Sequence, residues 1–166
     1  VNASVPVLLH EFIHVLGMDT GINPDGSFIY ENQASIYDRY ILNRDISDLP
    51  AVEMSESQRS ELFGSGDAVR MSGPSLTEAA PMLLNAGQVD GEIFLSGEAE
   101  QQALSHVSDT LDPESLMRVA GVETVDLGVV AYILSDLGWG PVADSSVSVQ
   151  PTEDGITLNV LADQSA

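Results

Sequence analysis

Residues 6–16 are apolar on almost every side, yet they contain two histidines and a glutamate. Pro6 near the start and Gly17 after the end are typical helix boundaries, and Ser4 is a suitable N-cap. Apolar residues surround the predicted helix almost completely, namely Leu8, Leu9, Phe12, Ile13, Val15 and Leu16. Such a pattern predicts a buried helix. Because burying two imidazoles and a carboxylate without partners is costly, the segment indicates a site.

The spacing of these polar residues, His10-Glu11-x-x-His14, matches the H-E-x-x-H pattern of zinc hydrolases. His10 and His14 lie one helical turn apart, so both rings can reach one ion. Glu11 lies about 100° around the helix from His10, close enough to hold a metal-bound water. Zinc in hydrolases keeps three protein ligands and one position for water. Glu11 would deprotonate that water for attack on a peptide carbonyl and pass the proton to the leaving amine.

A third ligand is required, and the sequence offers few residues for it. There are three histidines and no cysteines, so histidine and carboxylate must supply a transition-metal site. In the spacing H-E-x-x-H-x-x-G-x-x-H, Gly17 is in place but the ligand position is Thr20, with Asp19 one position out of register. The remaining histidine is His106. We predict His106 as the third ligand on ligand count, with Asp19 as the alternative.

Residues 8–18 resemble the active-site helix of leishmanolysin-type zinc metallopeptidases, which belong to the metzincins. Bacterial secreted relatives carry three further segments that this chain shares in order, Tyr37-Asp38-Arg39, Met54-Ser55-Glu56-Ser57-Gln58-Arg59 and Asp136-Leu137-Gly138-Trp139. The resemblance covers residues 5–140. It implies that His106 follows a long insertion and that Met117 belongs to a methionine-bearing turn beneath the zinc. Val107 and Arg118 depart from the residues usual in that family.

The resemblance implies an α+β fold, namely a zincin-like (metzincin) catalytic domain that is mainly helical and rich in loops. Residues 1–140 would be its C-terminal portion, with the active-site helix at 5–17 and without most of the N-terminal sheet that pairs with extended substrates. Residues 141–166 would be a linker and the beginning of a β-rich domain. Alternating apolar residues around 152–155 predict a β-hairpin there, similar to the opening of a cadherin-like or immunoglobulin-like repeat. We therefore expect a metalloendopeptidase that acts on proteins or peptides and is secreted or on the surface of a bacterium.

Other segments have weaker patterns. Ser55 and Gln58 form a capping box for a short helix that ends at Gly64. Residues 37–42 fit a strand or a helical turn, and residues 64–103 are expected to be irregular. Residues 125–137 predict a second helix that ends at Gly138. Its expected apolar stripe is Leu127, Val130, Ala131 and Leu134.

Composition excludes several classes of protein. Five arginines and no lysine stand against 26 acidic residues, which gives a net charge of −21 and repels nucleic acids and anionic membranes. Hydrophobic residues make up 43%, too many for a disordered acidic tail. The sequence contains no apolar run of about 18 residues or more, so no membrane span is expected.

Two alternatives to the peptidase remain open. One is a non-catalytic acidic extracellular module that binds calcium or a partner through Asp19, Asp25, Asp109 and Asp112, although none of these lies in a recognisable calcium-binding motif. The other is a degenerate zincin that binds metal for structural purposes, which the intact Glu11 disfavours.

The charge predicts that salt stabilises the fold. At a net charge of −21 the compact chain repels itself, and salt shortens the screening length from about 30 Å at about 0.01 M to about 10 Å at about 0.1 M. We expect the melting temperature, measured by differential scanning fluorimetry, to rise with sodium chloride over this range. An unchanged melting temperature from low to high salt would contradict this expectation.

Overall fold

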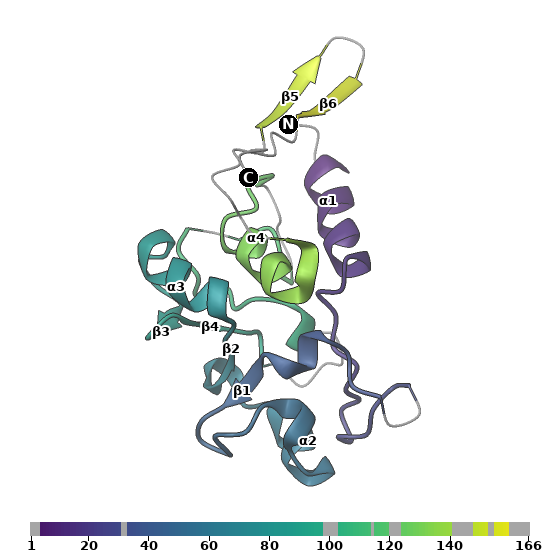
Figure 1. Ribbon diagram of the computed structural model, residues 1–166, viewed down its shortest axis with the longest axis vertical. Coiled ribbons are helices and arrows are strands. Elements are labelled where there is room, and N and C mark those ends of the chain that lie inside the picture. The colour runs from purple at the N-terminus through teal and green to yellow at the C-terminus, as the bar shows by residue number, and fades with distance from the viewer. Residues whose placement is uncertain are drawn as a thin grey trace.

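The computed structural model describes residues 4–30, 33–97, 103–113, 115–119, 124–140, 148–152 and 155–159. These residues form a mixed arrangement of helices and antiparallel strands, as the α+β expectation requires (Figure 1). The α-helices are α1 (Ser4–Val15), α2 (Glu56–Leu62), α3 (Pro74–Leu83) and α4 (Val129–Leu134). The strands are β1 (Ile41–Asn43), β2 (Val69–Met71), β3 (Gln88–Val89), β4 (Glu92–Phe94), β5 (Ser148–Thr152) and β6 (Gly155–Asn159). Short 3₁₀ turns cover Tyr37–Arg39, Ala51–Glu53, Gly66–Ala68 and Ala103–Ser105.

A four-stranded antiparallel sheet lies in the middle of the chain, in the order β1-β2-β4-β3. Arg70 on β2 is paired with Leu42 on one side and with Phe94 on the other. Three of these strands and α3 fall within residues 64–103, so the expectation of an irregular stretch was wrong. The strands are two or three residues long, too short for an alternating pattern to be visible in the sequence.

Helix α1 spans Ser4–Val15, so it begins earlier than the predicted segment 6–16 and includes Ser4, which was expected to cap it. Gly17 follows the helix with a φ of +106°, a conformation that suits glycine at a helix end. The prediction of a buried helix was wrong, because Leu8, Phe12 and Val15 are 70%, 55% and 80% exposed. The rest of the described chain packs against the face of α1 that carries Ile13 and His10, and both of these residues are buried.

The remaining helical predictions hold in part. Ser55 and Gln58 form the expected capping box at the start of α2. For residues 37–42, a strand and a helical turn were the two alternatives, and the structure contains both: a 3₁₀ turn comes first and the chain then continues into β1. Helix α4 begins later than predicted, at Val129, and continues into a π-helical turn (Ser135–Trp139) in which Gly138 has a φ of +101°. Its buried side chains are therefore Val129, Val130, Ile133 and Leu137, of which the predicted stripe contained only Val130.

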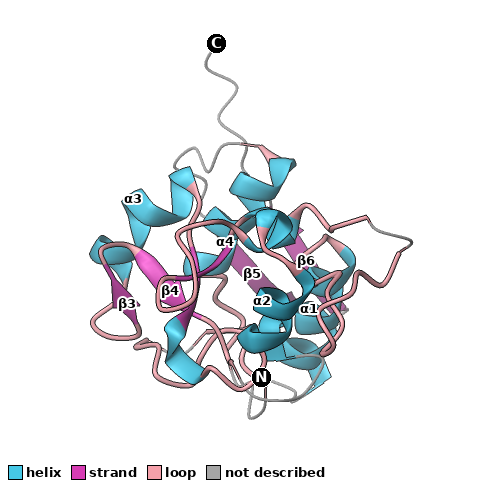
Figure 2. Ribbon diagram, turned by 90° about the horizontal axis from the view of Figure 1, so that it is seen from below, coloured by secondary structure: helices cyan, strands magenta, loops and turns pink. Residues whose placement is uncertain are grey.

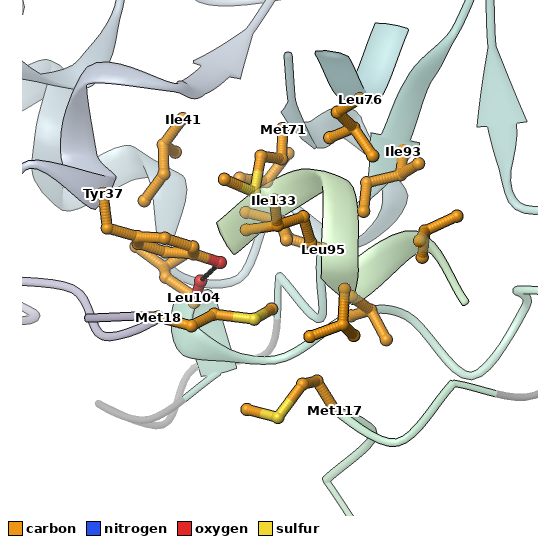
Figure 3. Close-up of a cluster of buried hydrophobic side chains, with 14 of the residues drawn as sticks. Met18, Tyr37, Ile41, Met71, Leu76, Ile93, Leu95, Leu104, Met117 and Ile133 are labelled. Atoms are coloured by element: carbon orange, nitrogen blue, oxygen red, sulfur yellow. Dashed lines mark hydrogen bonds between the residues drawn. The ribbon is translucent and has the colours of Figure 1, made fainter. Parts of the chain in front are cut away.

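The hydrophobic core joins segments from the whole length of the described chain. Met18, Tyr37, Met71, Leu95, Leu104, Met117 and Ile133 lie close together in it (Figure 3). Helix α4 lies between α1 and α3 in both orientations of the molecule (Figures 1 and 2). The core therefore connects the helix that carries the H-E-x-x-H motif to the sheet and to the segments around residues 104 and 117.

Strands β5 and β6 pair in antiparallel register from Ser148↔Asn159 to Thr152↔Gly155, which confirms the predicted hairpin. The predicted domain boundary at 141–144 lies outside the described residues. Among the helices described, none has the length and apolar content that crossing a membrane requires.

Asp136 ties the C-terminal helical segment to α3. Its carboxylate accepts hydrogen bonds from the backbone N–H groups of Ser75 (2.8 Å) and Leu76 (3.0 Å) in the first turn of α3. These are donors that the helix itself leaves unpaired. Asp136 thus serves as a cap supplied from a distant part of the sequence.

We expect Asp136→Ala to lower the free energy of unfolding by about 1–2 kcal/mol, the usual cost of a lost helix cap. Asp136→Asn keeps one acceptor oxygen and should lose less. Asp48→Ala is the matched control, because Asp48 is exposed and makes only a surface ion pair with Arg44 at 3.5 Å. Urea denaturation measures all three variants. Equal stability of the Asp136→Ala and Asp48→Ala variants would show that the cap contributes nothing.

Candidate metal centre

The three histidines of the chain come together at one point. His10 and His14 project from α1, and His106 follows the 3₁₀ turn Ala103–Ser105. The Nε2 atom of His10 lies 3.1 Å from that of His106 and 3.2 Å from that of His14, and the Nε2 atoms of His14 and His106 are 3.3 Å apart. His10 and His106 are buried, at 7% and 6% exposure, and His14 is half-buried. The predicted triad is therefore assembled in space.

The other ring nitrogens show which atoms face the centre of the triad. His10 Nδ1 lies 2.8 Å from the Leu116 carbonyl, and His14 Nδ1 lies 2.8 Å from the Met18 carbonyl. A carbonyl only accepts, so both Nδ1 atoms carry a proton, and the Nε2 atoms of the neutral rings present lone pairs. Lone pairs 3.2 Å apart repel one another unless a proton or cation lies between them. Hydrogen bonds from Nδ1 to carbonyls are also the usual support of metal-binding histidines.

The distances within the triad fit a tetrahedral ion. Nitrogen ligands about 2.0–2.1 Å from zinc at tetrahedral angles lie about 3.3–3.4 Å apart. The three observed Nε2 separations of 3.1–3.3 Å are close to that value. Among the described residues, His10, His14 and His106 are the group that could hold a metal ion.

The segment that carries His106 is fixed on several sides. The Tyr37 hydroxyl donates to the Leu104 carbonyl at 2.9 Å, the hydrogen bond drawn in Figure 3. The His106 carbonyl accepts from the Ser96 N–H, and the Val107 N–H donates to the Met117 carbonyl, both at 2.9 Å. Burial raises the pKa of Tyr37, so its hydroxyl keeps the proton that this contact needs. The backbone of His106, the predicted third ligand, is therefore held by hydrogen bonds on both sides.

The segment of the predicted methionine turn lies against the triad. Leu116 supplies the carbonyl that orients His10, and Met117 is completely buried in the core. The Met117 N–H donates to Ser115 Oγ at 3.3 Å. Arg118, one of the departures from the family pattern, pairs with Asp109 at 2.8 Å.

A cleft of about 350 Å³ opens onto the triad. It is lined by His10, Glu11, His14, Asp19, Ser105, His106 and Val119. Glu11 is exposed on α1 and shares this cleft with the three imidazoles. The cleft thus combines a group able to hold an ion, a carboxylate able to exchange protons, and access from solvent.

The aspartates of the alternative calcium site are separated into different contacts. Asp19 accepts from Ser105 in the cleft, and Asp25 accepts from Ser27 in an exposed turn, where this bond lowers its pKa. Asp109 pairs with Arg118, and Asp112 accepts from Asn85. None of the four joins the metal-capable group in the described part of the chain.

Sequence reasoning missed Asp38 as a support of the site. Its carboxylate is fully buried and accepts from Thr20 Oγ1 (2.7 Å) and from the N–H groups of Gly21 and Ser35. Burial raises the pKa of Asp38, and these hydrogen bonds oppose the rise. Thr20 and Gly21 are 18 and 17 residues away, so only the folded chain brings them to Asp38. The local signal that could have marked Asp38 is the Ser35-x-x-Asp38 spacing, in which the Ser35 N–H donates to the carboxylate and the Asp38 N–H donates to Ser35 Oγ.

Two residues of the segments that suggested the family resemblance hold loops around α1. Trp139 Nε1 donates to the Leu16 carbonyl at 2.7 Å, at the C-terminal end of α1. Arg59 Nε donates to the Gly26 carbonyl at 2.6 Å, and its guanidinium lies over the Phe28 ring. Both contacts restrain the chain that leaves the H-E-x-x-H helix.

The chain was compared with family profiles, with curated proteins and with solved structures, and it matches none of them.

We expect the protein to bind one zinc ion per chain and His106→Ala to lose most of that zinc on dialysis, because two ligands remain of three. At about 100 times its dissociation constant, zinc should raise the free energy of unfolding by about 2.7 kcal/mol. Elemental analysis and thermal melts with zinc measure both effects. Asp25→Asn, in an exposed turn, is the control and should behave as wild type. Equal zinc retention by His106→Ala and wild type would contradict the triad.

Proposed function

We propose that the chain is a zinc-dependent endopeptidase of the leishmanolysin-like, metzincin type. The observation that carries this proposal is the meeting of three imidazole Nε2 atoms at 3.1–3.3 Å in a cleft that Glu11 also lines. His10, His14 and His106 would hold the ion. Three protein ligands leave a position for water or substrate, which is the arrangement of catalytic rather than structural zinc.

The three histidines and Glu11, which all line the cleft, have definite parts in the proposed hydrolysis. Zinc held by the triad supplies a Lewis acid that polarises a carbonyl and lowers the pKa of water toward neutrality. Glu11, exposed to the cleft and outside the metal-capable group, can accept the proton of the attacking water. It can then donate that proton to the amine released when the peptide bond breaks. The backbone carbonyls of Leu116 and Met18 keep the histidine rings in the tautomer that binds metal.

The open cleft beside the three histidines, which Glu11 also lines, favours a catalytic metal over a purely structural one. A structural zinc site is closed by four protein ligands, whereas the described residues bring three histidines to this point and leave it open to a cleft. The non-catalytic alternatives differ in a measurable way. A structural site would bind zinc without hydrolysing peptides, and an acidic binding module would do neither.

We expect Glu11→Gln to lower kcat for peptide hydrolysis by about 10²–10⁴-fold, the usual contribution of a general acid–base group, with the zinc content unchanged. Glu61→Gln, an exposed glutamate on α2, is the matched control and should retain wild-type activity. A fluorogenic peptide library and metal analysis provide the two readouts. Hydrolysis that persists in Glu11→Gln would remove Glu11 from the mechanism, and a zinc-bound wild type without hydrolysis would favour the structural alternative.

A further inference from the structure

The segment 18–20, directly after the end of α1, contacts both histidine-bearing parts of the site, α1 and the segment around His106. The Met18 carbonyl accepts from His14 Nδ1 at 2.8 Å. Asp19 and Thr20 contact Ser105, the residue before His106. Thr20 occupies the position at which an uninterrupted H-E-x-x-H-x-x-G-x-x-H motif would carry its third ligand. Here this part of the chain contacts the third ligand's neighbour instead of supplying the ligand.

Ser105 is held by both of its hydrogen-bonding functions. Its side chain is buried, with 1% of the residue exposed. Oγ accepts the Thr20 N–H at 3.0 Å and donates its single proton to Asp19 Oδ1 at 2.7 Å. A hydroxyl with its one proton committed in this way has a fixed orientation.

The segment 18–20 is itself anchored on its other side. Thr20 Oγ1 donates to Asp38 at 2.7 Å, and the next N–H, that of Gly21, donates to the same carboxylate. Ser35 Oγ donates to the Asp19 carbonyl at 3.0 Å. The backbone around Asp19 is therefore held by hydrogen bonds from Thr20, Gly21 and Ser35, so that its carboxylate can hold Ser105 in one place.

We propose that Asp19 is a positioning residue that acts through Ser105 to set His106 against His10 and His14. This inference rests on the metal site of the proposed function. Asp19 lines the cleft but stands outside the metal-capable group of the described residues, so its role is to orient a ligand and not to be one. In the uninterrupted motif, the segment after the helix would itself supply the third ligand. Here the same segment supports His106, which lies 92 residues after His14, through a hydrogen bond to its neighbour Ser105.

The test compares three variants of the full chain. Asp19→Ala removes the acceptor of Ser105, Ser105→Ala removes the donor, and Asp19→Asn keeps an acceptor oxygen while removing the charge. Zinc affinity is measured by competition with a chelator, and the visible spectrum of the Co²⁺-substituted protein reports the coordination geometry. Because Asp19 is exposed, its replacement leaves the hydrophobic core intact. Ser72→Ala, which removes a half-buried hydroxyl on a different segment, is the matched control.

We expect Asp19→Ala and Ser105→Ala each to weaken zinc affinity by about 10–100-fold, the usual effect of losing a support of a metal ligand, and to alter the Co²⁺ spectrum. Asp19→Asn and Ser72→Ala should stay close to wild type in both measurements. Wild-type affinity in Asp19→Ala would overturn the positioning role. Equal losses in Asp19→Asn and Asp19→Ala would overturn it too, because the charge alone would then matter. A wild-type chain that binds no zinc would instead overturn the proposed function together with this inference.

Discussion

Three neutral imidazoles cannot present their bare nitrogens to one another at hydrogen-bond distance without a positive charge between them. In this protein the Nδ1 atoms of His10 and His14 lie against backbone carbonyls, so their Nε2 atoms face the centre of the triad. His106 closes the triad at 3.1 Å and 3.3 Å from these two nitrogens. A cation satisfies all three lone pairs at once, and the observed separations suit a tetrahedral one. Backbone hydrogen bonds of the surrounding segments hold these rings and the chain next to His106 in place.

The supports of the triad come from segments that are distant in sequence. Tyr37 holds the Leu104 carbonyl, two residues before His106, and Trp139 holds the Leu16 carbonyl at the end of α1. Asp136, three residues before Trp139, caps α3. The short segments that suggested a family resemblance thus have structural contacts around the site, and each of these contacts joins two parts of the chain. Rigid supports of this kind keep ligand geometry within the narrow range that metal binding requires.

Local patterns predicted the elements that local interactions determine. The presence of α1, the capping box of Ser55 and Gln58, and the β5–β6 hairpin could all be predicted from neighbouring residues. The four-stranded sheet could not, because strands as short as Val69–Met71 and Glu92–Phe94 have too few residues to show alternation. His106 could be selected because ligands had to be counted. The contacts of Asp38 with Thr20 and of Ser105 with Asp19 could not, because only the folded chain brings these residues near each other. The apolar residues Leu8, Phe12 and Val15 predicted burial, yet burial depends on what packs against a helix and not on the helix alone.

The central claim is that His10, His14 and His106 bind one ion together, and X-ray absorption spectroscopy at the zinc edge of the zinc-loaded protein tests it most directly. The expected result is a four-coordinate ion with three imidazole ligands at about 2.0–2.1 Å and one further light ligand. A six-coordinate shell of oxygen atoms without the multiple scattering of imidazole rings would contradict it. Such a result would place the metal at carboxylates, away from the three histidines.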